Sequence, residues 1–106
     1  MKGMPSEGTE LVLDGATTPD EWWMLVQEVR QRWPQALFRQ NAVGDLAFYR
    51  DQDALRASMS GGHLQSGIIQ VQIGPEHLRI VVDGKDASTL QVGKDVLEVL
   101  QALREE

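Results

Sequence analysis

The chain has 106 residues, of which 42% are hydrophobic and 25% charged; this fits one globular domain with a modest core and argues against general disorder. It has no cysteine, so disulfides, thiolate catalysis and cysteine-based zinc sites are excluded. The net charge of -6 comes from 16 acidic and 10 basic residues, and such a surface repels the phosphates that nucleic-acid-binding proteins must neutralise.

Residues 1–8 read MKGMPSEG and predict a flexible N-terminal lead, followed by a single α+β domain over residues 9–106. The lead lacks the apolar centre of a secretory signal. No apolar run in the chain approaches the roughly 20 residues that span a bilayer. We therefore expect a cytoplasmic protein that binds neither membrane nor nucleic acid.

The first predicted elements are a strand and a helix. Residues 10–13 form a short apolar run that favours a strand, buried or at an edge. Thr18 is a good helix N-cap, Pro19 suits the first helical position, and Glu21 completes a capping box. The helix ends before Pro34. Its apolar stripe has 4-3-4 spacing and consists of Trp22, Val26, Val29 and Trp33.

Two hairpins are predicted. Residues 36–40 and 46–50 form the first, with Phe38 opposite Phe48. The second joins strands within 68–83 through a four-residue loop at 74–77. This loop length places six alternating apolar residues on one face: Ile69, Val71, Ile73, Leu78, Ile80 and Val82.

Two further helices are predicted. Asp51 caps a short helix over residues 52–59, with Leu55 and Met59 facing inward. Ser88 caps the last helix, with Gln91 in the reciprocal position. The apolar stripe of the last helix consists of Val92, Val96, Val99, Leu100 and Leu103.

The element order is therefore β-α-β-β-α-β-β-α. Because local hairpins pair antiparallel, we expect a two-layer α+β fold with a mainly antiparallel sheet of four or five strands. The two longer helices cover one face of this sheet. The second face should be largely wet, because it carries Gln70, Gln72, Arg79 and Asp83; apolar residues interrupt it at Leu37, Tyr49, Ile68 and Val81.

No constellation of catalytic or metal-binding residues emerges from the sequence. His63 lies in a glycine-rich loop and His77 in the second hairpin turn, 14 residues apart, without the three or four convergent ligands of a zinc site. Asp51 and Asp53 resemble the start of a calcium loop, but the required glycine and final glutamate are absent. We therefore expect no metal site and no cofactor. We also expect no catalytic site, although an enzyme is the alternative considered below.

The unusual feature is a first helix that carries all three tryptophans. Trp23 lies off its apolar stripe, beside Gln27 and Arg30, and Met24 is expected to point almost opposite the stripe, away from the core and toward Gln31. Either a second element covers Trp23, or Trp23, Met24, Gln27 and Arg30 form a surface for a protein partner, since tryptophan and methionine are enriched at interfaces.

A sheet edge is a second candidate surface, because an unprotected edge pairs with other strands. The hairpin over residues 68–82 carries few protective charges, only Glu76 and Arg79. We expect that it allows edge-to-edge pairing and hence a homodimer.

These features predict a non-catalytic protein-binding domain, such as an inhibitor, an immunity-type protein, an adaptor or a chaperone. In size, acidity and element order the chain is similar to small type III secretion chaperones and to toxin-neutralising immunity proteins, without residues that identify either family. The alternative is a small enzyme or ligand-binding domain with a cleft near His63, Arg39 and Tyr49.

Overall fold

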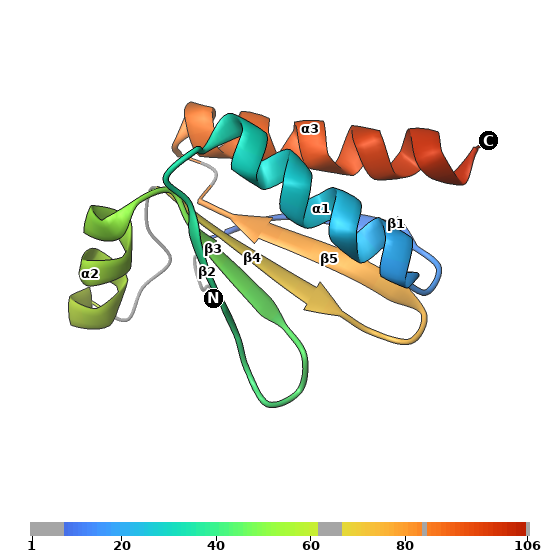
Figure 1. Cartoon of the computed structure of the whole chain (residues 1–106), viewed down its shortest axis with the longest axis horizontal. Coiled ribbons are helices and arrows are strands. Elements are labelled where there is room, and N and C mark those ends of the chain that lie inside the picture. The colour runs from blue at the N-terminus through green and yellow to red at the C-terminus, as the bar shows by residue number, and fades with distance from the viewer. Residues whose placement is uncertain (1–7, 62–66, 84, 106) are drawn as a thin grey trace, which may run out of the picture.

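The computed structural model describes residues 8–61, 67–83 and 85–105, and confirms the α+β fold in the predicted element order. Its elements are β1 (Thr9–Asp14), α1 (Pro19–Arg32), β2 (Leu37–Gln40), β3 (Leu46–Tyr49), α2 (Gln52–Gly61), β4 (Ile68–Ile73), β5 (His77–Val82) and α3 (Ala87–Arg104). The strands form one antiparallel sheet in the order β1-β5-β4-β3-β2. Figure 1 shows α1 and α3 together on one side of this sheet, with α2 at one end.

Both predicted hairpins form with the predicted registers. Phe38 lies opposite Phe48 between β2 and β3, and Val71 lies opposite Ile80 between β4 and β5. Gly44 in the first turn has a φ of 94°, in the left-handed region that glycine adopts without steric cost. The apolar alternation and the turn chemistry therefore specified the same pairings.

The main core lies between the sheet and the two long helices. The predicted apolar face of the second hairpin is buried there, apart from the half-buried Ile73. On α3, Gly93 allows a close approach to the sheet: a Cβ atom at this position would lie 3.3 Å from Cγ1 of Val82 and 3.5 Å from Cδ1 of Leu11. None of the helices in the described part of the chain has the length and apolar character that crossing a membrane requires.

The first helix begins as predicted and the last does not. Thr18 and Glu21 form the capping box, with Glu21 N donating to Oγ1 of Thr18 at 3.2 Å. The prediction of Ser88 as the cap of α3 is wrong. Asp86 is the N-cap, and its Oδ1 accepts hydrogen bonds from the amides of Ser88 and Thr89 at 3.1 and 3.3 Å. A carboxylate at this position satisfies two of the free amides of the first turn.

The second face of the sheet is only partly open. Ala54 of α2 packs with Tyr49 and Ile68 in a small cluster of buried residues, and Leu37 packs against it, so three of the four apolar interruptions predicted on this face lie at a helix; Val81 is not part of this cluster. The prediction that Met59 faces inward is wrong, because its side chain is 71% exposed. The first turn of α2 contributes Ala54 to this cluster, while Met59 lies more than a turn beyond it.

The edges of the sheet are β1 and β2, so the prediction of an open edge at the 68–82 hairpin is wrong. Both strands of that hairpin are central: β4 pairs with β3, and β5 pairs with β1. The hairpin needs few protective charges because neighbouring strands already satisfy its outer backbone groups.

Candidate functional site

The four residues predicted to form an interaction surface differ in exposure. Trp23 is 59% exposed, and Gln27 and Arg30 are exposed as well. Met24 is half-buried and packs against the main core, so the prediction that it points away from the core is wrong. The cause is that α1 has two covered sides, one against the sheet and one against α3.

Ion pairs mark the side of α1 that contacts α3. Glu21 binds Arg104 with 2.6 Å between Oε2 and Nε, and Arg32 binds Asp95 with 3.2 Å between Nε and Oδ2. At about 3.6 residues per turn, Trp23 lies on the opposite side of the helix from both contacts. Because α3 packs over β1 and β5, this free side of α1 is directed toward β2.

Beside Trp23 lies a shallow, mainly apolar depression of about 320 Å³. The indole rings of Trp22 and Trp23 meet edge to face, with their centroids 5.3 Å apart. Ile73, at the end of β4, lines one wall of this depression. The hydroxyl of Thr17, another lining residue, is buried without a hydrogen-bond partner among the described residues. The lining consists of Thr17, Thr18, Pro19, Trp22, Trp23 and Ile73.

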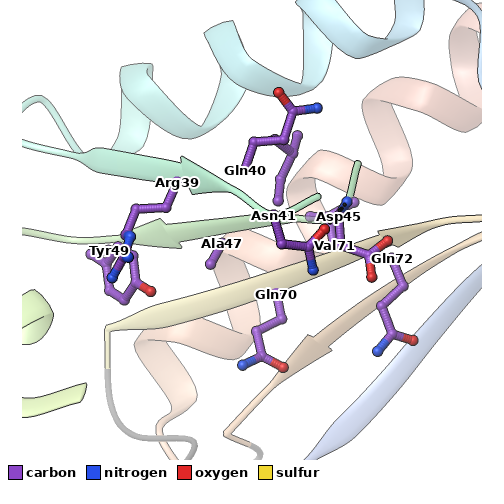
Figure 2. Close-up of a pocket in the computed structure, with 10 residues that line it drawn as sticks. Arg39, Gln40, Asn41, Asp45, Ala47, Tyr49, Gln70, Val71 and Gln72 are labelled. Atoms are coloured by element: carbon purple, nitrogen blue, oxygen red, sulfur yellow. Dashed lines mark hydrogen bonds between the residues drawn. The ribbon is translucent and has the colours of Figure 1, made fainter. Parts of the chain in front are cut away.

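A second depression of about 320 Å³ lies on the open face of the sheet, across β2, β3 and β4. Figure 2 shows Arg39 and Tyr49 toward one end, Gln72 toward the other and Gln70 between them. The structure therefore places Arg39 and Tyr49 at one site, as the predicted alternative cleft requires. The third member of that cleft, His63, lies outside the described residues.

Arg39 differs from most arginines of the chain because its side chain forms no hydrogen bond or ion pair with the described residues. Five other arginines have acidic partners: Arg32, Arg50, Arg56, Arg79 and Arg104. In a chain of net charge -6, a guanidinium without an acidic partner is a local positive site.

The most buried ion pair among the described residues joins Arg104 and Glu21. Arg104 donates to both carboxylate oxygens of Glu21, at 2.6 and 3.0 Å, and Glu21 is only 5% exposed. These hydrogen bonds hold the pKa of Glu21 below its ordinary value, and burial opposes the shift. The same contact raises the pKa of Arg104. The pair joins the start of α1 to the end of α3.

The other polar residues that the sequence analysis considered occupy structural positions in helices, strands or caps. His77 is half-buried and begins β5, so its predicted place in the turn is wrong by one residue. Asp51 accepts a hydrogen bond from the amide of Ala54 at 2.9 Å, which confirms its role as a helix cap. Ser58 donates to the carbonyl of Leu55. Within the part of the chain that the structure describes, no three acidic or histidine side chains gather closely enough to hold a metal ion.

Comparisons with protein-family models, curated proteins and solved structures gave no match to this chain. The site is therefore defined by its own geometry. The sequence nominated Trp23, Arg39 and Tyr49, but it did not nominate Phe38 and Gln40 of β2. The strand order places both residues on an edge strand, which the sequence does not reveal.

Proposed function

We propose that this domain is a protein-binding module and that the free side of α1 contacts the partner. The observation that carries this proposal is the exposure of Trp23, 59%, on a helix that already buries Val26, Val29 and Trp33 in the core. Because the indole of Trp23 is not part of the core, the ring is available to contact a partner. Exposed tryptophans of this kind are common hot spots of interfaces.

The surroundings of Trp23 fit an anchor residue. The adjacent depression lined by Pro19, Trp22 and Ile73 accepts an apolar side chain from a partner. Gln27 and Arg30 lie on the same side of α1 and are exposed, so they supply polar contacts at the rim. Such an arrangement, an apolar centre with a polar rim, is typical of transient protein interfaces.

The test is site-specific crosslinking followed by competition. A photo-crosslinking amino acid at Gln27 should capture one defined protein from native lysate, identified by mass spectrometry. The same probe at Met59, which is 71% exposed on α2, is the matched control for an exposed site elsewhere. Unlabelled protein should abolish the Gln27 crosslink, whereas Trp23→Ala protein should compete at least tenfold less well, because truncating a hot spot costs about 2 kcal/mol or more.

The crosslinked partner must then bind the purified domain in isolation. A blue shift of tryptophan fluorescence on binding, absent in the Trp23→Ala variant, reports burial of this ring. Equal competition by the Trp23→Ala variant and the unaltered protein would show that the proposed surface is wrong.

A further inference from the structure

No described strand pairs with the outer side of β2. The amide of Asn41 donates to the carbonyl of Asp45 at 3.0 Å, which directs the backbone of Asn41 toward β3. Strand residues alternate in this direction, so Arg39 also points its backbone groups toward β3. Phe38 and Gln40 therefore direct their N–H and C=O groups away from the sheet, where no described strand pairs with them.

The other edge is better protected. By the same alternation, Glu10, Val12 and Asp14 direct their backbone groups outward from β1. Two of these three residues are acidic, and charges on an edge oppose the approach of another strand. Arg104 also donates to the carbonyl of Asp14 and, at 3.1 Å, to that of Ala16, so a side chain already occupies acceptors at this end.

The charge beside β2 indicates what the open edge accepts. Arg39 lies between the two outward-facing residues, and its side chain lines the depression on the open face together with Tyr49. It has no acidic partner among the described residues. An acidic side chain on an added strand, directly opposite Arg39, would supply that partner. On the other face, Phe38 is 44% exposed and available for apolar contact.

A second copy of this chain fits the edge poorly. In the two-fold pairing that uses the outward groups of both Phe38 and Gln40, Arg39 of one copy lies directly opposite Arg39 of the other. Like charges directly opposite each other destabilise a strand pair. Each copy also carries a net charge of -6, which adds repulsion between the two molecules.

We propose that β2 binds an extended segment of a partner protein as a sixth, antiparallel strand, with an acidic residue opposite Arg39 and apolar residues on either side that contact Phe38. Backbone hydrogen bonds from Phe38 and Gln40 provide affinity, and Arg39 selects the acidic residue. Residues opposite Arg39 form a non-hydrogen-bonded pair, the arrangement in which cross-strand side chains come closest. This inference concerns a surface separate from Trp23 and goes beyond the proposed function of α1.

The test uses a capped seven-residue peptide with a central glutamate, a valine on each side of it and threonine elsewhere. The control is the same peptide with a central lysine in place of the glutamate. Titration of the full chain is followed by amide chemical shifts in nuclear magnetic resonance spectra. The glutamate peptide should shift the amide signals of Phe38 and Gln40 and bind about threefold to tenfold more tightly than the lysine peptide, as expected for an exposed cross-strand charge pair.

Three variants separate the contributions. Gln40→Pro removes an outward N–H while leaving the hydrogen bonds between β2 and β3 in place, because edge strands tolerate proline at outward positions. It should abolish peptide binding, whereas the matched control Gln40→Ala should retain it. Arg39→Gln should make the two peptides bind equally. Trp23→Ala should bind the glutamate peptide as the unaltered protein does, so failure of the α1 proposal and failure of this one are distinguishable.

Several outcomes would overturn the proposal. They are unchanged amide signals for Phe38 and Gln40 at millimolar peptide, equal affinity of Gln40→Pro and Gln40→Ala, or equal affinity of the two peptides for the unaltered protein. If capped glutamate alone binds as tightly as the peptide, the depression is a small-ligand site and not part of a strand-binding edge. If the same signals shift with protein concentration alone, a second copy occupies β2 and the assignment of an acidic partner segment is wrong.

Discussion

The two edges of the sheet, β1 and β2, differ in how the rest of the molecule covers them. β1 has six residues and lies under α3, and Arg104 binds the carbonyl groups at its end. β2 has four residues, and its central Phe38 remains 44% exposed. The comparison teaches that one antiparallel sheet can protect one edge with side-chain contacts while the other stays accessible. The exposure of β2 is the feature on which the strand-addition proposal rests.

Loss of Arg104 should produce the largest change, because this residue protects the β1 edge and pairs with a buried acid. Arg104→Met leaves the carboxylate of Glu21, 5% exposed, without its partner, and should lower the free energy of unfolding by about 3 kcal/mol. Urea unfolding followed by tryptophan fluorescence measures this loss. Arg56→Met is the control, because its pair with Asp53 is highly exposed and should contribute less than about 0.5 kcal/mol. Similar losses in both variants would contradict the special role of the β1 edge.

The next prediction compares the helix-covered faces of the two edge strands. Leu13 of β1 is 9% exposed, so Leu13→Ala should lower the free energy of unfolding by about 2 kcal/mol or more. Phe38 of β2 is larger but 44% exposed, so Phe38→Ala should lower it by only about 1 kcal/mol. The same urea titrations measure both values. A greater loss for Phe38→Ala would mean that β2 is as firmly covered as β1.

The smallest expected effect is the pH dependence of the stabilisation that the Glu21–Arg104 pair provides. Hydrogen bonds from Arg104 lower the pKa of Glu21 in the folded state below its ordinary value near 4.5. The resulting stabilisation is present in full above pH 4.5 and is lost as the pH falls through the lowered pKa. The stability difference between the unaltered protein and Arg104→Met should therefore shrink in acid. Urea midpoints of both proteins at neutral and strongly acidic pH test this.

The comparison with Arg104→Met is needed because other carboxylates also titrate in this range. The pKa values of Asp51 and Asp95 are lowered too, by a hydrogen bond from the amide of Ala54 and by one from Gln91, respectively. These contributions occur in both proteins and cancel in the difference. If the stability difference between the unaltered protein and Arg104→Met stays constant with pH, then Arg104 does not stabilise the ionised form of Glu21.

Candidate-site residues were predictable to different degrees. Helical spacing alone placed Trp23 off the buried stripe, and the structure shows its ring exposed. The same spacing misplaced Met24, because the sequence does not reveal that α3 packs against the side of α1. Arg39 and Tyr49 were nominated together and do line one depression. Their relation to a free strand edge could not be derived, since edge position depends on which hairpins lie next to each other.

The sequence by itself determined much of the local structure of this protein: the capping box of Thr18 and Glu21, the registers of both hairpins, and the buried centre of each long helix's apolar stripe, although Val99 and Leu103 are only half-buried and Leu90 and Leu97 pack against the core without having been predicted. These features depend on side chains a few residues apart, whose spacing is visible in the chain. Only the tertiary structure decided that β1 pairs with β5 and that β3 pairs with β4, which leaves β2 at an edge of the sheet that the described strands form. The reason is that pairing between distant strands depends on how whole hairpins and helices share one core, and no local pattern records that choice.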